Sequence, residues 1–182
     1  MPSAFTHAFA AFALGKASGV KRQVRFWVLS VFCAVVPDVD VVSFYFHVER
    51  GSMFAHRGLT HSLMFAVLLA LVVVWLGFRK TPAFSQRWWK LLLYFFIVTA
   101  SHGLLDALTN GGSGVAFFAP FDATRYFFLW RPIPISPIGM RFFSQRGLEV
   151  FWNEFLWIWI PASLVVGVVL LYRRLRVARE VS

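Results

Sequence analysis

The sequence predicts an all-α, multi-pass integral membrane helical bundle of about four to five hydrophobic helices with one long outer loop. Hydrophobic residues make up 59% of the 182 residues, the mean hydropathy is +0.67, and several apolar runs approach the ~20 residues that cross a hydrocarbon core. No linker divides the chain, so residues 1–182 are expected to form a single domain. The single cysteine, Cys33, excludes internal disulfides and cysteine-based zinc clusters.

Five apolar runs predict the helices in chain order. The first two, at 3–14 and 26–36, are short, and a continuation of the second through residue 46 is left open. The first run has no basic residue before Lys16, unlike a cleavable signal peptide, so it is expected to stay attached. The runs at 62–78, 91–108 and 150–172 are near or above spanning length, and the last is the predicted C-terminal transmembrane helix.

The basic residues predict how the bundle is oriented. Of the 18 lysines and arginines, 12 follow the first, third and fifth runs, and 6 lie on the other side of the bundle. The side with the excess is expected to be cytoplasmic, which places the N-terminus outside and the C-terminus inside. The net charge of +10 is then explained by topology and attraction to membrane lipid, and no nucleic-acid partner is expected.

Side chains that can bind a metal interrupt the apolar sequence at five places. They are Thr6-His7, Asp38 with Asp40, His56 with His61, His102 with Asp106, and Asp122. A carboxylate buried in a bilayer costs roughly 3 kcal/mol even on mild scales, so these residues need a structural or functional reason. The predicted orientation puts every cluster on the outer side, which predicts one shared site.

Two of the pairs have structural alternatives. His102 and Asp106 are four residues apart, so on a helix they point into one cavity and can either grip one ion or form a hydrogen bond between helices. Pro37 predicts a break in the helix just before Asp38 and Asp40. From a non-helical turn these carboxylates can converge on a cation, or they can cap a solvated helix end.

The histidines at 56 and 61 would lie about 140° apart on a helix and could not easily share an ion. Gly58 allows a turn between them, and Thr60 is the expected N-cap of a helix that begins at His61. This arrangement lets His56 fold back toward His61. His7 follows Thr6 in the same way at the start of the first apolar run.

The segment 110–149 is rich in glycine and proline and is the predicted outer loop. A loop of this length beside a polar cavity is more often functional than idle. Arg57, Arg125 and Arg131 can clamp a phosphate or carboxylate through bidentate hydrogen bonds. Alternatively, these arginines contact lipid head groups.

Several motifs together resemble one known family. They are Thr6-His7, Pro37-Asp38-x-Asp40, His56-Arg57-Gly58-x-Thr60-His61-Ser62, His102-x-x-x-Asp106-x-x-Thr109-Asn110 and Pro120-Phe121. In these motifs the chain resembles the YdjM-like family, described as LexA-regulated, membrane-bound, metal-dependent hydrolases. That family is grouped distantly with zinc-dependent phospholipase C and P1 nuclease, helical proteins whose zinc ions cleave phosphate esters.

The resemblance implies a ligand core within residues 1–122. The ligands it implies are His7, Asp38, Asp40, His56, His61, His102 and Asp106. The implied cofactor is a divalent metal, with zinc preferred and one to three ions. Asp38 or Asp40 is the candidate general base if it does not bind metal directly. The candidate substrate-binding residues are Arg57, Asn110, Asp122, Arg125 and Arg131.

Three function classes remain open. The leading hypothesis is a hydrolase of the bacterial inner membrane whose site faces outward and acts on a phospholipid or lipid-linked phosphate. A second is a structural or assembly protein that uses metal only to fold. A third is a cation or proton transporter, because intramembrane histidine and aspartate also mark ion pathways. The inner halves of the predicted helices carry no ionisable groups, which argues against transport.

Overall fold

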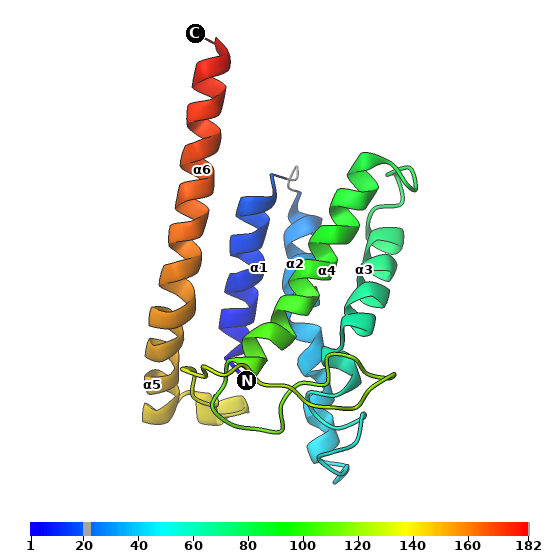
Figure 1. The fold of residues 1–182 in the computed structure, drawn as a ribbon, viewed down its shortest axis with the longest axis vertical. Coiled ribbons are helices and arrows are strands. Elements are labelled where there is room, and N and C mark those ends of the chain that lie inside the picture. The colour runs from blue at the N-terminus through cyan, green and yellow to red at the C-terminus, as the bar shows by residue number, and fades with distance from the viewer. Residues whose placement is uncertain (20–22, 182) are drawn as a thin grey trace.

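The computed structural model describes residues 1–19 and 23–181 and confirms an all-helical bundle (Figure 1). The elements are α1 (Ala4–Ser18), α2 (Val24–Val35), the 3-10 helices η1 (Val36–Phe44) and η2 (Leu59–His61), α3 (Leu63–Gly77), α4 (Gln86–Ala107), the 3-10 helix η3 (Gly139–Phe142), α5 (Gln145–Glu154), the π-helix η4 (Phe155–Trp159) and α6 (Ile160–Val181). Two isolated β-bridges are the only β-structure among the described residues. Lys21 and Arg22, which contribute to the basic excess, lie outside the described residues.

Three helical stretches are long and apolar enough to cross a membrane: Val24–Phe44, Gln86–Ala107 and Gln145–Arg179. The first joins α2 to η1, so the longer alternative for the second apolar run is confirmed. The expected non-helical turn after Pro37 is wrong. Proline is tolerated in the first turn of a helix, and here the chain changes from α to 3-10 hydrogen bonding and continues.

Helices α1 to α4 pack around one apolar core. The rings of Phe26 and Tyr94 stack with their centroids 4.6 Å apart. The Tyr94 hydroxyl lies 3.1 Å from the Ala11 carbonyl and 2.9 Å from the Ser30 hydroxyl, so α4 is bonded to both α1 and α2. Cys33 is fully buried in this core.

The C-terminal helix is the least enclosed part of the molecule. It begins at Gln145 rather than near residue 150. Only 6% of its most apolar 18-residue segment is buried. In Figure 1, α6 stands beside α1 and extends well beyond the other helices. The guanidinium of Arg173, in α6, donates to the Ala17 carbonyl at the end of α1. The apolar surface of α6 is therefore available to lipid.

The two ends of the bundle differ in chemistry. The N-terminus, the loop before α3 and the long loop after α4 lie at one end, whereas the C-terminus and the turn between α3 and α4 lie at the other (Figure 1). The predicted metal-capable clusters are all at the first end. This end holds the candidate site.

Candidate metal centre

The loop before α3 folds back on itself, as the sequence predicts. The ring centroids of His56 and His61 are 5.4 Å apart. Gly58 makes the turn possible, since a Cβ at this position would lie 2.1 Å from the Met53 carbonyl oxygen. The predicted N-cap is wrong: Ser62 caps α3 and accepts from the backbone N–H of Phe65, because α3 begins only at Leu63.

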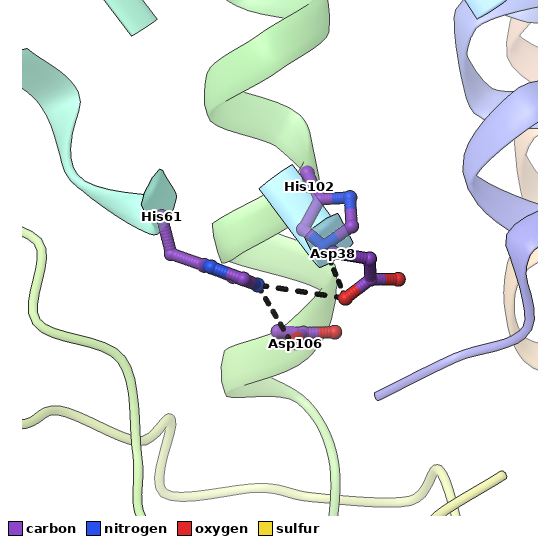
Figure 2. A group of neighbouring side chains, drawn as sticks. All are labelled: Asp38, His61, His102 and Asp106. Atoms are coloured by element: carbon purple, nitrogen blue, oxygen red, sulfur yellow. Dashed lines mark ion pairs between the residues drawn. The ribbon is translucent and has the colours of Figure 1, made fainter. Parts of the chain in front are cut away.

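Four side chains from three segments form the centre of the cluster (Figure 2). Asp38 comes from η1, His61 from η2, and His102 and Asp106 from α4. Each offers one ligand atom, and these atoms all lie within 4.8 Å of one another. His102 Nε2 is 3.3 Å from Asp38 Oδ1, and His61 Nε2 is 3.4 Å from Asp106 Oδ2. Two imidazoles and two carboxylates suit a tetrahedral zinc ion.

The polar atoms that face this centre lack hydrogen bonds. Among the described residues, Asp38 Oδ1, His61 Nε2, His102 Nε2 and both Asp106 carboxylate oxygens are buried without a hydrogen-bond partner. Buried polar atoms in proteins are almost always bonded, because leaving one unpaired costs about 1–3 kcal/mol. Several such atoms converging on one point fit a bound cation. The residues present therefore fit the predicted metal.

His102 is oriented for coordination by its other nitrogen. Its Nδ1 lies 2.7 Å from the Ala34 carbonyl oxygen, which can only accept, so Nδ1 carries the proton. In the neutral ring, Nε2 then carries the lone pair, and it points toward Asp38. Metal-binding histidines are commonly held in this way.

His7 lies beside this group. Its ring stacks on His102 with a centroid distance of 3.7 Å, and its Nε2 is 3.6 Å from Asp106 Oδ1. Both ring nitrogens are buried without a partner among the described residues. His7 therefore stays a predicted ligand that the structure places at the edge of the centre.

Asp40 is bonded on both carboxylate oxygens. His56 Nδ1 lies 2.6 Å from Oδ1, while Oδ2 accepts from the Arg57 backbone N–H at 3.0 Å and the Thr60 hydroxyl at 2.6 Å. The same oxygen is 3.1 Å from His61 Nδ1. Asp38, Asp40, His56 and His61 form a second group with metal-ligand geometry. Since Asp40 is already fully bonded, this second group is the weaker ion site, and Asp40 is better placed to orient the two histidines.

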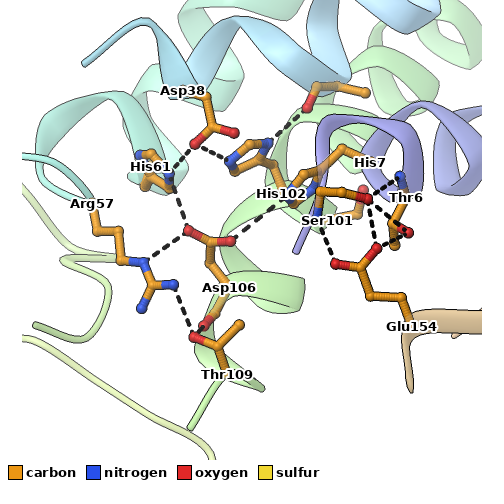
Figure 3. Close-up of polar contacts among 12 residues, drawn as sticks. Thr6, His7, Asp38, Arg57, His61, Ser101, His102, Asp106, Thr109 and Glu154 are labelled. Carbon is orange, nitrogen blue, oxygen red and sulfur yellow. Dashed lines mark hydrogen bonds and ion pairs between the residues drawn. The ribbon is translucent and has the colours of Figure 1, made fainter. Parts of the chain in front are cut away.

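The side chain of Arg57 crosses the base of the site, and only 2% of the residue is exposed. Its Nε lies 2.9 Å from Asp106 Oδ2, close enough for an ion pair but not aligned as a hydrogen bond. Nη1 donates to the Gly111 carbonyl and Nη2 to the Thr109 hydroxyl. A side chain at Gly112 would collide with this guanidinium, since a Cβ there would lie 2.7 Å from Nη1. Arg57 thus supplies one positive charge close to the carboxylates of Asp38, Asp40 and Asp106. Figure 3 shows its ion pair with Asp106.

The same carboxylates act on His61. Burial disfavours the charged imidazole, but the nearby carboxylates of Asp106, Asp38 and Asp40 outweigh it and raise the pKa of His61 well above its ordinary value. A proton on His61 therefore balances part of the negative charge when no metal is bound. Metal binding at Nε2 would require loss of that proton.

The remaining predicted substrate residues lie farther from the centre. Arg125 donates to the carbonyls of Ser52 and His56 and so ties loops together. Arg131 is exposed and covers the Phe127 ring. Asn110 is exposed, and the exposed Asp122 accepts from the Thr124 backbone N–H. None of these four belongs to the two metal-capable groups, and their roles stay predictions.

Glu154 is a buried acidic residue that lies outside the predicted site. It is fully buried and accepts from the Ser3 backbone N–H at 2.6 Å, the Ser3 hydroxyl at 2.5 Å and the Thr6 hydroxyl at 2.7 Å. Trp159 Nε1 also donates to Thr6. Glu154 thus holds the start of α1, where His7 follows Thr6 (Figure 3). In the sequence, the signal for this buried contact was an acidic residue inside the last apolar run.

The fold and this cluster define an integral membrane protein with a metal-capable group of side chains at one end of a helical bundle. The chain belongs to the YdjM inner membrane protein family, which matches residues 1–177. It is similar to inner membrane protein YbcI of Escherichia coli (strain K12), with 36% identity over 176 residues that cover 96% of this chain and 100% of that protein. No solved structure matches it. The predicted family and inner-membrane location are therefore confirmed.

Proposed function

We propose that this protein is a membrane-embedded, metal-dependent hydrolase that cleaves a phosphate ester of a membrane lipid. The observation that best supports the proposal is the set of buried nitrogen and oxygen atoms on Asp38, His61, His102 and Asp106 that face one another without hydrogen-bond partners. A divalent ion held there would lower the pKa of a bound water toward ~7 and stabilise negative charge on a phosphoryl oxygen.

The proposal gives the nearby residues separate roles. Asp40 holds His56 through Nδ1, and 11% of the His56 side chain is exposed. The Nε2 atom of His56 can then take the proton from the attacking water, while Asp40 keeps the ring in the required orientation. Asp40 accordingly acts through His56, and Asp38 acts as a ligand. Arg57 stays fixed to Asp106 and balances charge.

A metal-stabilised structural protein is the second candidate. The burial of the ligands favours it, because the side chains of His61, His102 and Asp106 are 0% exposed. A structural ion has all its positions filled by protein, whereas a catalytic ion keeps one for water or substrate. The structural alternative predicts metal binding without turnover.

Metal content tests the site. We expect the purified wild-type protein to contain a divalent metal, and His102→Ala and Asp106→Ala to lose most of it, because each removes a ligand and leaves its neighbours unpaired. Elemental analysis by mass spectrometry measures the content. The matched control is His47→Asn, because His47 is exposed in the loop after η1, outside both metal-capable groups, and Asn tolerates its positive φ of 50°. Full occupancy in both site variants would refute the ligand assignment.

Turnover tests the reaction. Metal-replete protein should release a phosphorylated or dephosphorylated product from at least one class in a set of mixed phospholipids and lipid-linked phosphates. A chelator should stop the release, and zinc should restore it. If no lipid class yields a product although the metal stays tightly bound, the structural role replaces the enzymatic one.

A further inference from the structure

A cavity of about 400 Å³ opens beside the candidate metal centre. His56 and Arg57 form part of its wall, so it reaches the side of the centre where His56 is partly exposed. The rest of the wall comes from Met1 at the N-terminus, the end of η1, the loop before α3 and the long loop after α4. This volume lies at the lower end of the range of small-molecule pockets.

One wall of the cavity is apolar and reaches the end of a candidate membrane-spanning stretch. It includes Phe44, Val48, Ile135 and Ile138. Phe44 is the last residue of the membrane-spanning stretch Val24–Phe44, and it is 47% exposed. Its ring also meets His56 edge-on, with the centroids 5.3 Å apart. An apolar chain that enters from the bilayer along Phe44 would therefore arrive beside His56.

Arg50 places in the cavity wall a cation that is not paired with any described residue. The Nη groups of Arg57 and Arg125 donate to protein acceptors, as described above. Arg50 also lines the cavity, and no described residue forms a hydrogen bond or ion pair with its guanidinium. An unpaired arginine beside an apolar wall is complementary to an anion that carries an apolar chain.

We propose that this cavity binds an anionic membrane lipid, with its phosphate between Arg50 and His56 and the adjoining part of its chain against Phe44, Val48, Ile135 and Ile138. What happens to the lipid there rests on the proposed hydrolase function, but the binding itself does not. Arg50 then replaces Arg57 and Arg125 as the principal phosphate-binding residue. The remainder of the lipid stays in the bilayer, because the cavity is too small for a whole two-chain lipid.

Photo-crosslinking with an alkyl phosphonate tests the proposal without any turnover. The probe is decylphosphonate with a diazirine near the end of its chain, which contains no hydrolysable ester. It is added to the full chain in nanodiscs of neutral lipid, with a chelator present. We expect the labels, mapped by peptide mass spectrometry, to lie in segments 44–55 and 111–138. A decyltrimethylammonium probe with the same diazirine should not label these segments above background, and inorganic phosphate should compete at least tenfold more weakly than unlabelled decylphosphonate.

Variants test whether the probe binds in this cavity. Arg50→Gln should weaken probe binding about tenfold, and Arg50→Lys less, because lysine keeps the charge but loses the planar fork. Val48→Trp, which fills the apolar side, should also reduce labelling. Arg141→Gln is the matched control, since Arg141 is exposed at the same end but does not line the cavity. Thermal unfolding confirms that each variant is folded.

The outcomes separate this proposal from the enzymatic one. Equal labelling of wild type and Arg50→Gln, or equal competition by inorganic phosphate and decylphosphonate, would overturn the lipid site. Specific labelling without lipid hydrolysis by metal-replete protein would overturn the hydrolase and leave the lipid site standing. If an Arg50→Gln variant hydrolyses lipid at the wild-type rate and KM, the lipid site is overturned and the hydrolase proposal stands.

Discussion

Asp38 and Asp40 are only two positions apart, yet their surroundings differ. Asp40 has hydrogen-bond partners on both oxygens, including His56 and Thr60, whereas Asp38 Oδ1 has none and faces His61 and His102. A carboxylate with free lone pairs is the better ligand, and a fully bonded one is the better orienting group. The sequence supplied both acids as candidates, but it could not distinguish these roles.

His56 is the residue at which ion binding and catalysis can be separated. We expect His56→Ala to lower the rate of lipid hydrolysis by roughly 10²–10⁴-fold, the usual contribution of a general base, while most of the metal is retained. Metal analysis and product release are measured on the same preparation. The prediction fails if metal and turnover are lost together, since His56 would then be a ligand rather than a base.

Gly58 provides a test of the turn that brings His56 back to His61. Gly58→Ala should destabilise the protein by about 1–3 kcal/mol or more, since the new Cβ would collide with the Met53 carbonyl oxygen. Thermal unfolding measures the loss. Gly51→Ala in the same loop is the control, because a Cβ there meets no atom within 4 Å. Equal unfolding temperatures for the two variants would contradict this steric account.

At the scale of elements, the helical geometry of η1 separates the two aspartates. With three residues per turn, side chains two positions apart point in directions about 120° apart. Asp38 is thus directed at α4, while Asp40 is directed at the loop before α3. Pro37 is compatible with either a break or a 3-10 continuation, so its presence alone could not reveal this arrangement.

The interface between α1 and the C-terminal helix depends on Glu154. We expect Glu154→Ala to lower the free energy of unfolding by roughly 1–3 kcal/mol, since the buried groups of Ser3 and Thr6 lose their acceptor. Glu149→Ala is the control, because Glu149 forms only an exposed ion pair with Arg146, and such pairs contribute little. A loss in the control equal to that in Glu154→Ala would show that the buried network is not responsible.

Local chemistry determined which parts of the fold could be predicted. Long apolar runs predicted the positions of the helices, because length and apolar composition are properties of the sequence itself. The last helical stretch, from α5 through α6, extends beyond the predicted 150–172 at both ends. The His102–Asp106 pair was also predictable, since a four-residue spacing on a helix fixes its geometry. The partners of Glu154 and Arg125 were not, because they lie on segments distant in the chain. Only the packed fold defines such contacts.

At the scale of the whole molecule, the sidedness of the site is the main prediction. The site lies at one end of the bundle, and the excess of basic residues predicts that this end faces away from the cytoplasm. In a Cys33→Ser background, an impermeant thiol reagent applied to spheroplasts should label Phe121→Cys and Leu129→Cys, which are 87% and 105% exposed in the wild-type residues. Arg87→Cys, at the opposite end, should react only after permeabilisation. The reverse pattern would move the site to the inner leaflet.

The spread of the candidate ligands along the chain has a consequence for biogenesis. A nascent membrane protein inserts from its N-terminal side, so Asp38 reaches the membrane long before His102 and Asp106 of α4 are synthesised. Any metal loading of the four-residue group would therefore be a late event, possible only after α4 has been inserted. Until then Asp38 of η1 lacks its partner His102 from α4. Acquisition of the ion would mark the completion of assembly.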